Sequence, residues 1–122
     1  MLNKVFVYGT LMKGNKTRGL DQFPGSRFLG EAVTSSSTYS MYDLGAFPAV
    51  CLSGNNAIKG EVWEVDENTF YVIDRIEGFP DFYNRKLVET NHGVAWMYYI
   101  PKIDQDKFAT KIDAQNEVAW VA

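Results

Sequence analysis

Glu77 is the residue of this chain whose type and position best suit acid–base chemistry. It lies four positions after Ile73 and seven after Phe70, so a helix over this segment would place its carboxylate on the apolar face. It would also lie in the last helical turn, next to the negative end of the helix dipole. Burial and this dipole both disfavour the charged form and raise the pKa of a carboxyl group. Such a group can take and return a proton near neutral pH.

A second candidate is the loop that follows the first apolar run, in the sequence VFVYGTLMKG from Val5 to Gly14. The run ends at Gly9, and a glycine at a strand exit permits positive φ and lets a ligand approach the backbone. The short polar turn that follows, with Thr10 and a second glycine at Gly14, would then present free backbone N–H groups, which suit a carboxylate or a carbonyl oxygen. The same pattern is also typical of an ordinary turn.

Other arrangements of these acidic and basic residues stay open. Glu77 could lean outward from the helix end, or form an ion pair with Arg75 or Arg85. Tyr83 and Arg85 lie two positions apart at the start of a predicted strand, so they would share one face. Arg85 could hold a carboxylate of the ligand, or it could pair with Asp74 of the helix.

The remaining chemically distinctive residues give weaker indications. Strand alternation places Tyr98 and Tyr99 on opposite sides of a sheet, and the inward one could offer a hydroxyl to a ligand or simply pack. Cys51 is the only cysteine and His92 the only histidine, and nothing in the sequence pairs them as nucleophile and base. Metal-ligand spacing and the Gly-Lys-Ser ending of a phosphate loop are absent. The sequence therefore predicts neither a metal nor a cofactor.

Composition narrows the class of protein. The 122 residues fit a single domain over 1–122, and a hydrophobic fraction of 46% is enough for a packed core. A net charge of −3 argues against nucleic acid as a partner. No stretch is long and apolar enough for a membrane span, and no signal peptide is visible. With one cysteine, a reducing cytoplasmic compartment is the simplest expectation. The oligomeric state is not predicted.

Short apolar runs between frequent glycines and prolines predict many strands and few helices. The predicted strands are Lys4–Tyr8, Arg27–Val33, Tyr39–Leu44, Ala49–Leu52, Ile58–Val65, Arg85–Glu89 and Ala95–Ile100. The stretch Asn91–Gly93 predicts a hairpin turn, and Ser53–Asn56 predicts another turn between two strands. One helix is predicted, with Asp66 as its N-cap and Gly78 as its end.

Three segments are less regular. A short helix after Gly14 and a terminal strand near Val118–Val121 are possible, and Asp104–Asn116 has no clear pattern. The expected fold class is a small α+β domain dominated by strands, with a closed or nearly closed sheet.

Five segments together resemble the γ-glutamylcyclotransferase-like family, which includes γ-glutamylamine cyclotransferases and AIG2-like proteins. They match in the family's order between about residues 5 and 100, whereas the stretch after Pro101 matches poorly. The segments are Tyr8–Leu11, YDLGAFPAV (Tyr42–Val50), IKGEVWEVD (Ile58–Asp66), IDRIEGFPDFYNR (Ile73–Arg85) and AWMYYI (Ala95–Ile100).

The resemblance implies a small mixed β-barrel flanked by helices. It also implies an intramolecular reaction in which the α-amine of a γ-glutamyl group attacks that group's own side-chain carbonyl. The ring closes to 5-oxoproline, and an amine or amino acid leaves; the partner is thus a small γ-glutamyl substrate. Glu77 aligns with the family's catalytic glutamate, and Tyr8–Leu11 align with its substrate loop. Tyr98 aligns with a tyrosine that follows Ala-Trp, and Tyr83 and Tyr98 are expected to line the pocket.

Two alternatives belong to other functional classes. The same barrel could bind a small amide-bearing or anionic metabolite without converting it. It could also act as an interaction scaffold, with its pocket blocked by its own side chains such as Phe79 or Phe82.

Overall fold

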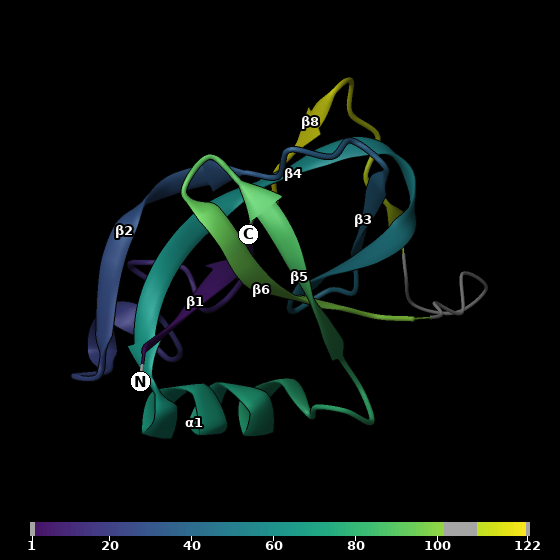
Figure 1. Cartoon of the computed structure of the whole chain (residues 1–122). Helices are drawn as coiled ribbons and strands as arrows, with labels where there is room; N and C mark the ends of the chain where they lie inside the picture. The colour runs from purple at the N-terminus through teal and green to yellow at the C-terminus, as the bar shows by residue number, and fades with distance from the viewer. Residues whose placement is uncertain (1, 102–109, 122) are drawn as a thin grey trace.

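A curled mixed sheet with one α-helix across its end forms the structure, which is a computed structural model describing residues 2–101 and 110–121 (Figure 1). The elements are β1 (Leu2–Val7), η1 (Leu20–Gln22, a 3-10 turn), β2 (Ser26–Val33), β3 (Tyr39–Asp43), β4 (Pro48–Asp66), α1 (Glu67–Glu77), β5 (Asn84–Thr90), β6 (Gly93–Tyr99), β7 (Thr110–Lys111) and β8 (Glu117–Val118).

Strand β1 lies in the middle of the sheet, parallel to β6 and antiparallel to β4. Its residues Val5, Phe6 and Val7 are all buried, because both faces of the strand are covered. Val5 and Val7 join the core that contacts α1, whereas Phe6 belongs to the core inside the curl. One strand therefore links the two hydrophobic clusters. It also ends directly at the candidate loop.

Strand β4 is one long strand of 19 residues, and the prediction of two strands with a turn between them is wrong. Its first half pairs with β3, and its second half pairs with β1 and β2. The residues Ala49–Leu52 and Ile58–Val65 thus lie on the same strand and run in the same direction.

The glycine and asparagine residues that predicted the turn form a bulge instead. The register moves from Tyr39 opposite Asn56 to Ser40 opposite Cys51, so the residues between Cys51 and Asn56 leave the ladder. A Cβ atom on Gly54 would lie 2.3 Å from the carbonyl oxygen of Tyr39. A close approach between two backbones therefore requires this glycine.

The sheet curls without closing into a barrel. Its strands follow the order β5-β6-β1-β4-β3-β7, and β2 and β8 also pair with β4. The edges at β2 and β5 meet at one isolated bridge, between Thr34 and Thr90. One further backbone–backbone hydrogen bond, from the Ser35 N–H to the Glu89 carbonyl oxygen at 2.9 Å, supports this contact, and the Asn91 side chain accepts the Val33 N–H at 2.9 Å. The mixed, nearly closed sheet that was predicted is confirmed, with this gap along its edges.

Helix α1 begins and ends where the sequence predicts. The Asp66 carboxylate accepts the Thr69 N–H at 2.8 Å, and hydrogen bonds from Thr69 lower the pKa of Asp66. Gly78 ends the helix in the left-handed conformation, with φ of 66°. The buried Ile73 fixes the face that packs on the sheet. Figure 1 shows α1 lying across the end of the curled sheet, below β1.

The less regular segments form little regular structure. The possible helix after Gly14 is reduced to the 3-10 turn η1, so α1 is the one α-helix among the described residues. The resemblance had implied several. The possible terminal strand is found slightly earlier, as β8. Of the stretch Asp104–Asn116, residues 104–109 lie outside the described part, and 110–111 form β7. The predicted hairpin at Asn91–Gly93 is confirmed, because β5 and β6 pair on either side of it.

Candidate active site

A pocket of about 180 Å³ lies where β1, α1 and the start of β4 meet. All the residues expected at a catalytic or substrate-binding site except Arg85 line this pocket; they are Glu77, Tyr8–Leu11, Tyr83 and Tyr98. Seven further residues join them, mostly apolar. The lining residues are Phe6, Val7, Tyr8, Gly9, Thr10, Leu11, Arg18, Phe47, Pro48, Ile76, Glu77, Phe82, Tyr83 and Tyr98.

Glu77 is the last residue of α1, and its carboxylate lies in the pocket wall. No hydrogen bond or ion pair joins this carboxylate to any residue that the structure describes, so the alternatives with Arg75 and Arg85 do not apply. Burial raises the pKa of Glu77 to about 7, and the positive charge of Arg18 acts in the opposite direction. The carboxyl group can therefore gain or lose a proton near neutral pH.

The backbone at the end of the helix holds Glu77 in place. The N–H groups of Gly78 and Phe79 donate to the carbonyl oxygens of Arg75 and Asp74, at 3.1 and 2.9 Å. This pair of hydrogen bonds with a left-handed glycine is a Schellman motif. The last turn is thereby fixed, and with it the position of the Glu77 backbone beside the pocket.

The loop Tyr8–Leu11 leaves β1 and lines the same pocket as Glu77. A turn closes it through the Met12 N–H and the Gly9 carbonyl oxygen, at 3.0 Å. Among the hydrogen bonds of the described residues, none is donated by the N–H groups of Gly9, Thr10 or Leu11. Such unused donors beside a pocket can bind an oxygen that carries negative charge.

Gly9 is required at this position for a different reason from the one predicted. It does not have a positive φ. Instead, a Cβ atom here would lie 2.8 Å from the Cγ and Cδ atoms of Pro48. The glycine lets the loop pack directly against the first residue of β4, which fixes the position of this part of the pocket wall.

Three tyrosines form much of the wall, and each of their hydroxyls already donates to the protein. Tyr8 donates to the carbonyl oxygen of Tyr98 at 2.8 Å, and Tyr83 donates to that of Pro48 at 2.6 Å. Tyr98, the inward member of the Tyr98–Tyr99 pair, donates to Asp74 at 2.5 Å. Burial is the largest cause that raises the pKa of all three tyrosines. They stay neutral near pH 7, and they present rings rather than free donors to the pocket.

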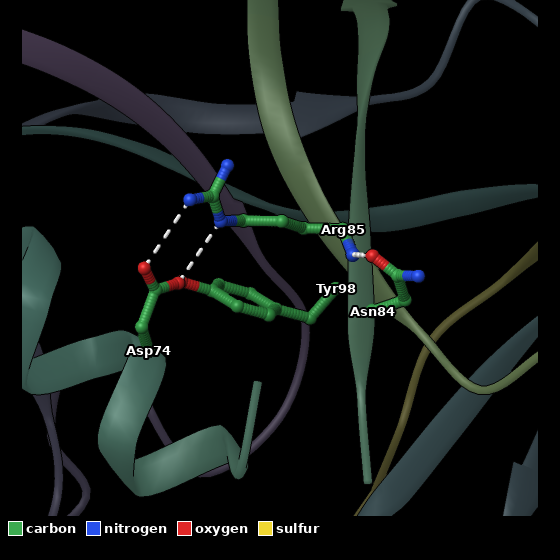
Figure 2. A network of polar contacts seen from close by, with 4 residues as sticks. All are labelled: Asp74, Asn84, Arg85 and Tyr98. Carbon is green, nitrogen blue, oxygen red and sulfur yellow. Dashed lines mark hydrogen bonds and ion pairs between the residues drawn. The ribbon is translucent and has the colours of Figure 1, made fainter. Parts of the chain in front are cut away.

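Arg85 is engaged by the helix rather than by the pocket. Its guanidinium donates to the Asp74 carboxylate at 3.0 and 3.3 Å, and Figure 2 shows Asp74 reaching from α1 to both Arg85 and Tyr98. Three aromatic rings surround the guanidinium, with centroids 4.2 to 4.7 Å away; they belong to Phe70, Phe79 and Trp96. Of the two partners left open for Arg85, the structure has Asp74.

Sequence reasoning missed Arg18, Phe47, Pro48 and Ile76, among others that line the pocket, and it named Phe82 only as a side chain that could block the pocket. Pro48 and Phe47 lie within YDLGAFPAV, which was noticed only as part of the resemblance. Ile76 directly precedes Glu77 and is apolar, so nothing in its type marked it as a pocket residue. Arg18 had no local signal, because it reaches the pocket through a loop whose path depends on contacts with distant residues.

Residues 2–101 and 110–121 contain no group of three or more His, Cys, Asp or Glu side chains placed to hold a metal ion. Over the same residues, no helix has the length and apolar character needed to cross a membrane.

Fold and site together define a class of protein, in which a small curled sheet brings one unpaired carboxyl group and a glycine loop with unused N–H groups to the same pocket. The chain belongs to the family described as gamma-glutamyl cyclotransferase, AIG2-like, whose model matches residues 5–121.

Individual relatives agree with this family. A Vibrio cholerae protein, whose name proposes a gamma-glutamylcyclotransferase, is 41% identical over 98 residues, which are 80% of this chain and 82% of that protein. The solution structure of ytfP from Escherichia coli has a TM-score of 0.67 and 29% identity, covering 93% of this chain and 94% of that one. An AIG2-like protein from Mus musculus shares the fold, with a TM-score of 0.71 and 23% identity over 86% of this chain and 81% of that one.

Proposed function

We propose that this chain is a γ-glutamylcyclotransferase that releases 5-oxoproline from a γ-glutamyl amine or a γ-glutamyl amino acid. The observation that carries the proposal is the unpaired Glu77 carboxyl group, whose pKa is raised to about 7. It lines the same pocket as the loop Tyr8–Leu11. Membership of the family supports the same reaction.

The proposed reaction needs a proton to move twice. At neutral pH the α-amine of the substrate is an ammonium group, and Glu77 in its charged form removes a proton from it. The free amine attacks the γ-carbonyl carbon, which forms the new C–N bond of a five-membered ring. Because the nucleophile is tethered to the carbonyl, proximity contributes little to the barrier. Glu77 now holds the proton that the leaving nitrogen requires.

The second step breaks the original amide bond. The carbonyl oxygen carries negative charge in the tetrahedral intermediate, and the N–H groups of Gly9, Thr10 and Leu11 are the donors proposed to stabilise it or the substrate's carboxylate. Glu77 returns its proton to the departing nitrogen as the C–N bond breaks. The ring nitrogen loses its remaining extra proton to Glu77, which passes it to the released amine. The products are therefore 5-oxoproline and the leaving group as an ammonium ion, and Glu77 is again a carboxylate. In this scheme Tyr8, Tyr83 and Tyr98 shape the wall around the γ-glutamyl group.

The test is to incubate the purified chain with a panel of γ-glutamyl amines and γ-glutamyl dipeptides and to measure 5-oxoproline. Glu77→Gln keeps the size of the side chain but removes the base, so we expect turnover to fall by about three orders of magnitude or more. Glu67→Gln is the matched control, because Glu67 lies at the exposed start of the same helix. It should leave turnover unchanged.

The opposite result would favour a binding protein. If no substrate of the panel yields 5-oxoproline, and saturable binding of a γ-glutamyl compound survives Glu77→Gln, the proposed enzymatic function is wrong.

A further inference from the structure

Arg18 is a cation at the pocket to which the chemistry above assigns no contact with the substrate. It lies in the loop between β1 and η1, is exposed, and lines the pocket together with Glu77. Its guanidinium makes no hydrogen bond or ion pair with any other residue in the described ranges. An unpaired guanidinium beside a pocket is suited to binding a carboxylate, with which it can form two parallel hydrogen bonds.

The loop holds the backbone of Arg18 in a defined position. The Asn15 side chain accepts the N–H groups of Thr17 and Arg18 at 3.1 and 3.0 Å. The Leu20 N–H donates to the Leu11 carbonyl oxygen at 2.9 Å, which ties this loop to the end of the Tyr8–Leu11 segment. Arg18 is therefore attached to the same backbone that forms the pocket wall.

The charges of the pocket indicate what Arg18 can bind. Among the lining residues, Glu77 and Arg18 are the two with charged side chains, and the others are apolar, aromatic or neutral. In the proposed reaction Glu77 handles protons and must stay free of a permanent ion pair. An anionic group of the substrate would therefore find its favourable side-chain charge at Arg18.

Exposure decides which end of the substrate reaches Arg18. The γ-glutamyl group has to lie between Glu77 and the loop N–H groups, in the buried part of the pocket. The leaving amine then points to the open side, where Arg18 is exposed to solvent. We propose that Arg18 binds a carboxylate on the leaving amine, so that the preferred substrates are γ-glutamyl amino acids rather than γ-glutamyl amines. This inference rests on the proposed function.

Two substrates that differ only in this charge test the inference: γ-glutamyl-alanine and γ-glutamyl-alaninamide. For Arg18→Met we expect kcat/KM for γ-glutamyl-alanine to fall about tenfold, which is the usual effect of losing one charge-assisted hydrogen-bonding partner. Loss of the Arg18 charge also acts on the pKa of Glu77, but this effect is common to both substrates. The variant should therefore lower kcat/KM for γ-glutamyl-alaninamide several-fold less than for γ-glutamyl-alanine. Arg18→Lys should keep part of the preference, because it keeps the charge.

Lys16→Met is the matched control. Lys16 is an exposed cation two positions away in the same loop and does not line the pocket. Its loss should leave both substrates unaffected. If Arg18→Met instead slows both substrates equally, Arg18 acts on the γ-glutamyl half that they share or on the loop itself, and the inference is overturned.

A binding measurement separates this inference from the proposed function. In the Glu77→Gln background, calorimetry should find tighter binding of γ-glutamyl-alanine than of the alaninamide, and Arg18→Met should remove the difference. If this holds while wild-type protein forms no 5-oxoproline, carboxylate binding by Arg18 stands and the proposed reaction fails. If the two ligands bind equally well with Arg18 present, the inference fails even when 5-oxoproline is formed.

Discussion

The Glu77 carboxyl group is more easily protonated in the folded chain than in the unfolded chain. Its folded pKa is about 7, because burial disfavours the charge, whereas an unfolded glutamate has a pKa of about 4.3. Between these values the folded state holds a proton that the unfolded state has lost. The stability contributed by protonated Glu77 is therefore fully present below about pH 4.3 and is lost as the pH rises through about 7.

This linkage predicts a pH-dependent effect of Glu77→Gln. Glutamine does not titrate, so the variant should match wild type near pH 4 and exceed its free energy of unfolding by about 1–2 kcal/mol at pH 8. This value is smaller than the full difference in pKa would give, because the pocket is open to solvent and solvent screens the charge. Urea unfolding at the two pH values measures it. A difference between variant and wild type that is the same at both values would contradict the prediction, and Glu67→Gln serves as the control.

The contact between Gly9 and Pro48 predicts a second effect at the scale of single residues. Gly9→Ala would place a Cβ atom 2.8 Å from the proline ring, so the loop must shift and its N–H groups move with it. We expect a loss of about 1–3 kcal/mol in the free energy of unfolding and a tenfold or greater loss of turnover.

The double variant Gly9→Ala with Pro48→Ala checks the cause, because alanine lacks the ring atoms that would clash. Stability should then return toward that of Pro48→Ala alone. A double-mutant cycle without a favourable coupling energy would show that the contact is not responsible.

At the scale of elements, Asp74, Arg85 and Tyr98 join α1 to β5 and β6. Asp74 lies in the same turn as Glu77, and it receives hydrogen bonds from one residue of each strand. The aromatic rings around Arg85 shield this ion pair, and both of its side chains are 18% exposed. Partly buried pairs with two hydrogen bonds contribute more to stability than exposed ones. The network therefore sets how the end of α1 sits on the sheet.

Arg85→Lys is predicted not to be a conservative change. Lysine cannot donate along two parallel directions, nor stack as a plane on the rings of Phe79 and Trp96. We expect the free energy of unfolding to fall by about 1–2 kcal/mol, with a lower kcat because Glu77 is less well positioned. Arg27→Lys is the control, since the Arg27 side chain in the pair with Glu64 is 73% exposed. Equal effects of the two substitutions in denaturation would contradict this role.

The elements that were predicted correctly from the sequence are those whose ends are determined by residues within or beside them. Helix α1 has its N-cap Asp66 and its terminal Gly78 within its own segment, and the β5–β6 hairpin has its turn between its strands. The predicted turn within β4 failed because glycine and asparagine are also the residues that a bulge requires. Only the opposite strand distinguishes the two, since it is the carbonyl oxygen of Tyr39 that approaches Gly54.

At the scale of the molecule, the curl is held where β2 and β5 approach each other. Thr34 lies at this point and is only 3% exposed to solvent. Its hydroxyl accepts the Ile58 N–H at 2.9 Å and donates to the Ser36 carbonyl oxygen at 2.9 Å. The hydroxyl thus links the end of β2 to β4 next to the single bridge with Thr90.

Thr34→Val keeps the shape of the side chain but leaves the buried Ile58 N–H without this acceptor. We expect a loss of about 1–3 kcal/mol in the free energy of unfolding, together with faster amide hydrogen exchange at Ser35. Thr38→Val is the control, because Thr38 is exposed and its hydroxyl forms a hydrogen bond with Ser36 alone among the residues that the structure describes. A Thr34→Val protein as stable as wild type would contradict the prediction.

Those residues of the candidate site that belong to a recognisable local sequence pattern could be predicted. The position of Glu77 follows from helix spacing, and Tyr8–Leu11 follow from the end of an apolar strand. Arg18 and Pro48 could not be found in this way. Their approach to the pocket depends on how the loop packs on Leu11 and on how β4 begins beside Gly9, and these are contacts between distant segments.

The continuity of β4 has a consequence for synthesis on the ribosome. The strands β1, β2 and β3 do not pair with one another, and each finds its ladder partners in segments that are translated later. A nascent chain that has not yet exposed residues 48–66 therefore has no strand with which to begin the sheet. Residues 1–47 therefore stay unpaired, in the exit tunnel or in solvent, until residues 48–66 emerge from the ribosome and pairing of the sheet begins.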